Sequence, residues 1–255
     1  MYKGIFDSHA HYDDPRFDED REVKLAELRS EGVEYVMDIG ADLQTSANAL
    51  KIAEQHDFVY CAVGVHPSEA ETLPEDYTAQ LEAMAASPRV RAIGEIGLDY
   101  HYEGYSKERQ QRVFAEQLAL ARRLALPVVI HSRDAHSDTM EILREHTPRG
   151  VVHCYSGSAQ MAEQLVELGL YIGFTGVVTF KNARRALEAA AAVPLERLLI
   201  ETDCPYLAPE PYRGQRCDSL MLGGVAEALA RVKGVSAEEI VQATRENAKR
   251  LYDIS

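Results

Sequence analysis

Eight short apolar runs, separated by segments with helical spacing of apolar residues, constrain the fold of this chain most strongly. This alternation is typical of parallel β-α units. The runs are short and rich in apolar residues, so both faces of each strand are expected to be buried, as in parallel sheets. The runs span residues 5–9, 35–39, 58–65, 90–96, 127–131, 150–154, 171–174 and 198–202.

The number of runs predicts an α/β fold, a single (β/α)8 TIM-type barrel. About 250 residues is usual for that fold, and the chain has 255. A doubly wound open sheet is the alternative, but no Gly-x-Gly-x-x-Gly turn follows the first run. No repeat or linker marks a second domain, so we expect one domain over residues 1–255. Residues 205–214 predict a long loop, and Ser236 with Glu239 predicts a capping box that begins an extra C-terminal helix.

The formal net charge of −14 argues against tight, charge-driven attachment to long duplex nucleic acid, which needs Lys and Arg. It leaves room for an enzyme that binds phosphodiesters in a cleft where divalent cations supply positive charge. A signal-peptide pattern and a bilayer-length apolar stretch are both missing, so a cytoplasmic protein without a membrane partner is expected. The four cysteines are scattered, with no C-x-x-C pair, and are expected to be free thiols.

Two histidines, His9 and His11, end the first predicted strand. Successive side chains in a strand point to opposite faces, so these two project the same way, as do Ile5 and Asp7. Two imidazoles aimed at one point are a potential metal-ligand pair. On these residues alone, hydrogen-bonded histidines at a strand end are an equally good interpretation.

Further ionisable residues fall at the carboxyl ends of later predicted strands, which form the active-site face of (β/α)8 barrels. Together with His9 and His11 they give six potential ligands from five strands. Polar groups at the mouth of an apolar strand need a partner, and a metal ion supplies one. Six ligands exceed what one tetrahedral ion normally takes from a protein, so two ions are predicted. The later residues are Glu95, His131 and His153 at the ends of the fourth, fifth and sixth strands, and Asp203 just past the eighth.

Motifs along nearly the whole chain resemble those of TatD-type metal-dependent deoxyribonucleases, within the wider group of amidohydrolase-like barrels. Several long motifs in the right order are more specific than any single one. One departure follows Gly214, where the family continues with a basic residue and then Arg-Asn-Glu-Pro. Here residues 215–219 are Gln-Arg-Cys-Asp-Ser, so the substrate contacts of that loop are not carried over. The matching motifs are DSHAH at 7–11, GVHP at 64–67, GEIGLDY at 94–100, LPVVIHSRDA at 126–135, HCYSGS at 153–158, ETDCPYLAP at 201–209 and YRG at 212–214.

The resemblance implies how the ligands divide between two divalent ions. A carboxylate can span two ions about 3.5–4 Å apart. Histidine and carboxylate ligands together suit Zn, Mn, Ni or Fe, and Mg fits this sequence as well. In the implied arrangement, His9, His11 and Asp203 hold one ion, His131 and His153 hold the other, and Glu95 bridges them.

The resemblance also implies hydrolysis of DNA phosphodiester bonds from a strand end, as in an exonucleolytic deoxyribonuclease acting on single strands or ends. Asp203 would orient the attacking water or take its proton, and Glu95 would act through both ions. The alternative is an ester or amide hydrolase, such as a D-aminoacyl-tRNA deacylase. Many amidohydrolases bridge their metals with a modified lysine, and Glu95 in its place disfavours only the cyclic-amide enzymes. We expect no stable sequence-specific nucleic-acid complex, and a monomer or weak homo-oligomer.

Candidate substrate contacts lie in the loops around the predicted metal site. His66 could donate to a phosphate oxygen, or could simply stabilise the turn before Pro67. Arg133, expected on the loop above the site, offers a bidentate donor to a phosphate, unless it pairs with Asp134 or Asp138. The remaining candidates are Lys181 and Arg213 for phosphate, and Tyr206, Tyr212, Tyr100 and Tyr102 for stacking on bases.

Two more carboxylates are expected inside the barrel. Asp7 and Glu201 share strand parity with His9 and Asp203 respectively. Each should hydrogen-bond a ligand histidine or another buried polar group, as supporting residues of metal sites do. An internal salt bridge, for example with Arg91, is the alternative.

Overall fold

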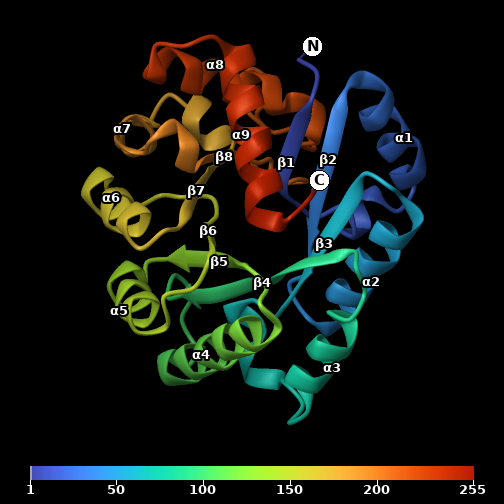
Figure 1. Cartoon of the computed structure of the whole chain (residues 1–255), viewed down its shortest axis with the longest axis vertical. Coiled ribbons are helices and arrows are strands. Elements are labelled where there is room, and N and C mark those ends of the chain that lie inside the picture. Colours follow the sequence, from blue (N-terminus) through green and yellow to red (C-terminus); the bar gives the residue numbers. More distant parts are fainter. Residues whose placement is uncertain (1) are drawn as a thin grey trace.

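The computed structural model describes residues 2–255 and confirms the predicted barrel architecture (Figure 1). Eight strands form one sheet in chain order, and each consecutive pair is parallel. The strands are β1 (Ile5–Ala10), β2 (Val33–Ile39), β3 (Val59–Val63), β4 (Val90–Asp99), β5 (Val128–Arg133), β6 (Gly150–Val152), β7 (Tyr171–Phe174) and β8 (Leu198–Ile200).

Helices alternate with the strands and cover the outside of the sheet (Figure 1). Local sequence explains where several begin, since Asp42 and Thr45 form a capping box and Ser106 accepts a hydrogen bond from the amide of Arg109. The helices are α1 (Arg21–Glu31), α2 (Leu43–Gln55), α3 (Tyr77–Met84), α4 (Lys107–Leu124), α5 (His136–His146), α6 (Ala159–Glu167), α7 (Arg184–Ala192), α8 (Leu222–Lys233) and α9 (Ala237–Tyr252).

The predicted extra C-terminal helix is α9. Ser236 is its N-cap and accepts a hydrogen bond from the amide of Glu239 at 3.1 Å. The reciprocal bond of a capping box is not formed by these two residues, so that prediction was half right. None of the helices in residues 2–255 has the length and apolar character needed to cross a bilayer.

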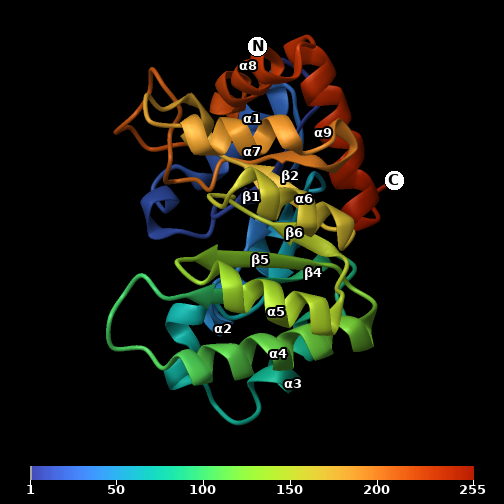
Figure 2. The ribbon, with the colours of Figure 1, turned by 90° about the vertical axis from the view of Figure 1, so that its left-hand side faces the viewer.

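The barrel interior is filled by one residue or two from each strand together with the last turns of α9. The hydroxyl of Tyr252 on α9 donates to the backbone carbonyl of Ser8 at 3.3 Å. In Figure 2, α9 lies on the side of the barrel opposite the long loops that follow β4 and β8. One end of the barrel is therefore closed by α9, and the end with the long loops is left to form a site. The interior cluster includes Phe6, Met37, Ile39, Ala62, Ala92, Val129, Val151, Tyr171, Leu199, Leu251 and Tyr252.

The first and last strands meet through a few specific contacts instead of a continuous ladder. Backbone amides of Asp203 and His11 donate to the carbonyls of His9 and Cys204, both at 2.9 Å. The buried carboxylate of Asp7 accepts bonds from the amide and the hydroxyl of Thr202 at 3.0 and 2.6 Å. The barrel is thus closed at the point where ligands from both ends of the chain are needed.

Two strands extend further than the sequence pattern predicted. The prediction that Glu95 ends the fourth strand was wrong, because β4 continues to Asp99 in register with β5, after a register shift between Ile93 and Ile96. The prediction that Arg133 lies on a loop was also wrong, because it is the last residue of β5. Residues 205–214 contain neither helix nor strand, as predicted for a long loop.

Candidate metal centre

A first group of four side chains meets inside the mouth of the barrel, reaching it from β1, β4 and the segments just past β1 and β8. The Nε2 atoms of His9 and His11 lie 3.1 Å apart, as expected for two side chains on one face of a strand. Asp203 Oδ1 lies 3.6 Å from Nε2 of His9 and 3.4 Å from Nε2 of His11. The fourth atom, Glu95 Oε2, lies 3.5 Å from Nε2 of His9 and 3.9 Å from Nε2 of His11.

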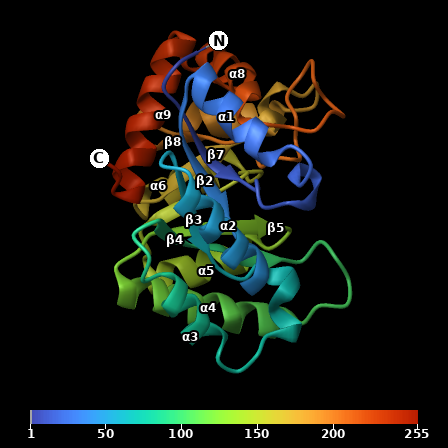
Figure 3. The ribbon, with the colours of Figure 1, turned by 90° about the vertical axis from the view of Figure 1, so that its right-hand side faces the viewer.

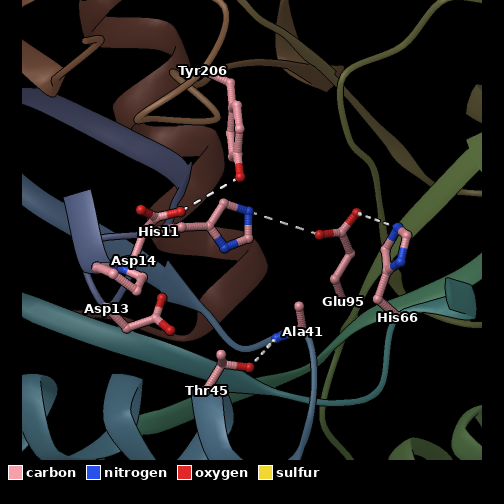
Figure 4. Close-up of a pocket in the computed structure, with 9 residues that line it drawn as sticks. His11, Asp13, Asp14, Ala41, Thr45, His66, Glu95 and Tyr206 are labelled. Carbon is pink, nitrogen blue, oxygen red and sulfur yellow. Dashed lines mark hydrogen bonds and ion pairs between the residues drawn. The ribbon is translucent and has the colours of Figure 1, made fainter. Parts of the chain in front are cut away.

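A second group shares the same glutamate. Glu95 Oε1 lies 2.7 Å from His153 Nε2 and 2.9 Å from His131 Nδ1, and these two nitrogens are 3.4 Å apart. The two oxygens of Glu95 thus face different groups of histidines. Figure 4 shows Glu95 between His11 and His66. The structure therefore brings all six predicted ligands together, with Glu95 between the two groups.

The spacing of these atoms fits divalent cations. A tetrahedral ion with bonds of about 2.1 Å has ligand atoms about 3.4 Å apart. Most separations in the first group and the distance between His131 and His153 are close to this value, whereas the two contacts of Glu95 with these histidines are shorter. Several lone pairs also face one another in a buried place, and this arrangement needs a proton or a cation between them. Both groups consist of nitrogen and carboxylate oxygen, the donors that transition metals and zinc prefer.

The pKa values of His9 and His11 shift in opposite directions, so the two rings are not protonated together near neutral pH. Burial and the neighbouring His153 lower the pKa of His9 to about 4. Burial also disfavours the charged form of His11, but the hydrogen bond and charge of Asp203 raise its pKa to about 10. For Glu95, the charge of His153 and bonds to His131 and His153 outweigh burial and hold its pKa well below the usual value. The centre thus combines ionised carboxylates with rings that compete for one proton.

Asp7 and Glu201 both hydrogen-bond other buried polar groups and not a ligand ring, which is one of the two outcomes predicted for them. Glu201 accepts hydrogen bonds from the backbone amide of Cys154 and from the hydroxyl of Ser8, and its Oε1 lies 3.7 Å from His153 Nδ1. A side chain at Gly173 would collide with this carboxylate, which explains the glycine there. Asp7 contacts no ligand ring. Its carboxylate accepts hydrogen bonds from Thr202 and Ser219, which are the other buried polar groups of that prediction.

Asp99 is a further acidic residue of the centre that was not predicted from the sequence. Its Oδ2 lies 3.2 Å from His131 Nε2, and its backbone amide and carbonyl are both bonded to the side chain of Gln110 at 2.9 Å. With His66 and His131 it forms a third cluster of potential ligand atoms. A signal was present, because Asp99 shares strand parity with Glu95, but the predicted strand stopped at residue 96.

A cleft of about 610 Å³ opens beside the centre, and its lining includes four of the ligands together with His66, Tyr102, Arg133 and Tyr206. His66 Nε2 lies 3.8 Å from Glu95 Oε1, while its Nδ1 contacts the hydroxyl of Ser68 at 2.8 Å. His66 is also the N-cap of the short 3-10 helix Pro67–Thr72. It therefore faces the cleft and stabilises the turn as well.

Four candidate substrate contacts lie outside this lining, namely Lys181, Arg213, Tyr212 and Tyr100. Lys181 is exposed, and Arg213 is exposed and stacks on the ring of Phe180, 4.3 Å from its centroid. Arg133 does line the cleft, and its partner is Tyr102, whose hydroxyl accepts a bond at 3.3 Å. Arg133 forms no ion pair with Asp134 or Asp138, the two partners considered from the sequence.

The loop that departs from the family pattern is anchored to the first part of the chain. Arg216 pairs with Asp20 and also donates to the carbonyl of Arg16 at 2.6 Å. The hydroxyl of Ser219 donates to Asp7 at 2.6 Å and contacts the hydroxyl of Tyr12 at 2.8 Å. In this chain, residues 216–219 therefore support the join between β1 and β8.

Known proteins with similar sequences and structures identify the family of this chain. The family model described as TatD related DNase matches residues 6–253. The uncharacterized metal-dependent hydrolase YabD of Bacillus subtilis is 41% identical over 98% of this chain and 100% of its own length. The 3'-5' ssDNA/RNA exonuclease TatD of Cronobacter sakazakii is 36% identical over 97% of each chain. The crystal structure of the TatD homologue YjjV from Escherichia coli superimposes with a TM-score of 0.94 at 35% identity, covering 100% of both chains.

Proposed function

The chain belongs to the TatD-related DNase family and is a metal-dependent hydrolase, and we propose that it uses two divalent ions to hydrolyse phosphodiester bonds at an end of a DNA strand. The observation that carries the proposal is that one carboxylate, Glu95, faces two groups of ligand atoms. The relative in Cronobacter sakazakii, named as an exonuclease of single-stranded DNA and RNA, supports a nucleic-acid substrate.

His9, His11 and Asp203 would hold one ion, His131 and His153 the other, and Glu95 would contact both. Ions in such a site supply positive charge for the phosphate oxygens and make water more acidic.

The side chains around the ions have separate roles in hydrolysis. Asp203 can accept a proton from the attacking water because it lines the cleft and is ionised, since hydrogen bonds and charge from the histidines hold its pKa below the usual value despite burial. The water oxygen bonds to phosphorus, the bond from phosphorus to the sugar oxygen of the remaining strand breaks, and that oxygen takes up the proton, so the terminal nucleotide leaves with its phosphate. Arg133 and His66 line the same cleft and would hold the phosphate oxygens.

A smaller cavity of about 290 Å³ beside His11 supports attack at a strand end (Figure 4). Its lining includes the carboxylates of Asp13 and Asp14 and no Lys or Arg side chain. Asp13 Oδ1 is buried and has no hydrogen-bond partner. A phosphate chain that continued through this cavity would meet the carboxylates of Asp13 and Asp14 without a Lys or Arg side chain in the lining to bind it. A terminal sugar with a free hydroxyl would instead find an acceptor.

A panel of substrates tests the proposal. After chelation, the protein is loaded with Mg, Mn, Zn or Ni and given linear and circular single-stranded DNA, duplex DNA, single-stranded RNA and D-aminoacyl-tRNA. We expect release of mononucleotides from linear single strands and no cleavage of circles. Efficient deacylation of D-aminoacyl-tRNA without release of nucleotides would instead favour the ester hydrolase. Cleavage of circles and linear strands at equal rates would contradict attack at an end.

A further inference from the structure

Two exposed tyrosine rings border the cleft that holds the metal ligands. Tyr102 is 56% exposed and Tyr206 is 46% exposed, although both line the cleft beside Glu95, His131 and Asp203. Large aromatic side chains bury much apolar area when they pack. Rings that remain half-exposed at a cleft are therefore available to a ligand.

The two rings come from loops on opposite sides of the mouth of the barrel and line the same cleft. Tyr102 lies in the loop after β4 and Tyr206 in the loop after β8. In a closed barrel of eight strands in chain order, β4 and β8 are on opposite sides. Figure 3 shows both loops extending from the same end of the barrel, on opposite sides of its mouth. The metal ligands, which come from strands around the barrel, lie between them.

Each ring is paired with an arginine. The guanidinium of Arg133 lies over Tyr102, 5.3 Å from the ring centroid, and donates to its hydroxyl at 3.3 Å. The guanidinium of Arg16 lies over Tyr206 at 4.1 Å. Asp14 helps to hold this second pair, because its carboxylate contacts Arg16 at 3.2 Å and Tyr206 at 3.4 Å. Each pair thus places an aromatic face beside a cation.

An aromatic face beside a cation matches the two parts of a nucleotide. A nucleobase stacks on the ring, and the cation attracts the phosphate attached to it. The bases of a duplex are already stacked on one another and are not free to do this, so only unpaired bases fit. The acidic cavity that includes Asp13 lies on the Tyr206 side of the cleft, since Tyr206 lines both.

We propose that Tyr206 with Arg16 binds the unpaired base of the terminal nucleotide, and that Tyr102 with Arg133 binds the unpaired base on the other side of the scissile phosphate. This inference rests on the proposed function and adds the reason for selecting single strands. It also assigns one base to each ring, so each ring should respond to the loss of its own base only.

The test combines tyrosine variants with substrates that lack single bases. Wild type, Tyr206→Leu and Tyr102→Leu are compared on an oligothymidylate, on the same strand without the terminal base, and on the same strand without the penultimate base. Tyr206→Phe and Tyr102→Phe keep the rings. Tyr212→Leu is the matched control, because Tyr212 is also 46% exposed in the same loop but lines neither cavity.

We expect each Leu variant to bind the intact strand about fivefold to 150-fold more weakly, the effect of losing one base–aromatic stack. Removing the terminal base should not weaken the binding of Tyr206→Leu any further. Removing the penultimate base should likewise not weaken the binding of Tyr102→Leu any further. The Phe variants and Tyr212→Leu should resemble wild type. RNA strands should give the same pattern if stacking is the recognition.

Two outcomes separate this inference from the proposed function. If wild type cleaves strands with and without the bases equally well and Tyr206→Leu and Tyr102→Leu match Tyr212→Leu, the two tyrosines do not bind bases. The proposed nuclease activity would still stand. If wild type cleaves no oligonucleotide with any metal, the proposed function itself fails. Circular dichroism of each variant establishes that it is folded.

Discussion

Asp99 Oδ2 lies 3.2 Å from His131 Nε2, while Nδ1 of the same ring lies 2.9 Å from Glu95. A carboxylate bonded to one ring nitrogen places the proton there and leaves the lone pair of the other nitrogen for a metal ion. His131 is thereby oriented toward Glu95 and His153.

Replacing Asp99 with Asn should weaken metal binding at this second group. The neutral amide stabilises the oriented ring less well, and losses of about 10-fold to 100-fold are typical for such partners. Competition with a chromogenic chelator measures the affinity. Asp138→Asn is the control, because Asp138 bonds Tyr100 and Gln111 and no metal-ligand candidate. Equal affinities in both variants would show that Asp99 does not orient His131.

Replacing Glu95 with Ala should abolish hydrolysis and lower the occupancy of both ions, because its two oxygens face both groups. The metal content after dialysis, measured by atomic emission, should fall by more than one ion per chain. Glu54→Ala, an exposed glutamate, is the control. Turnover at the wild-type rate in the Glu95 variant would refute the bridging role.

Replacing Ser219 with Ala should destabilise the fold. The substitution removes a 2.6 Å bond to the buried carboxylate of Asp7, and a lost bond to a charged group costs about 1.5–3 kcal/mol in free energy of unfolding. Urea denaturation measures the change. Ser30→Ala removes an exposed hydroxyl of α1 and should change stability by less than about 0.5 kcal/mol. Similar stabilities of the two variants would mean that residues 216–219 do not support the barrel join.

Replacing Arg133 with Ala should weaken substrate binding more than metal binding. Arg133 lines the cleft but contacts none of the six ligands, so a charge-assisted bond to phosphate is its expected contribution. Losing one raises KM about 10-fold to 100-fold. Oligonucleotide kinetics and chelator competition separate the two effects. Arg144→Ala, which bonds Gln164 on the outside of the barrel, should leave both unchanged; unchanged kinetics in the Arg133 variant would remove it from the site.

Features with short sequence periods could be predicted well. The eight strands and the shared direction of His9 and His11 follow from apolar runs and from the alternation of side chains along a strand, and both are local properties. The position of Glu95 within β4 could not be predicted in the same way. It depends on the register shift between Ile93 and Ile96, which is set by the pairing of β4 with β5.

The sequence by itself determined the barrel topology and which strand carries each ligand, because each strand specifies its own periodicity. Only the tertiary structure decided that His9 and His11 reach Asp203. That contact depends on the meeting of β1 with β8, nearly 200 residues apart, through Asp7, Thr202 and two backbone bonds. It likewise decided that Asp99 reaches His131 and that residues 216–219 hold the join. Such contacts depend on the register between strands and on loop packing, which are nonlocal and leave no period in the sequence.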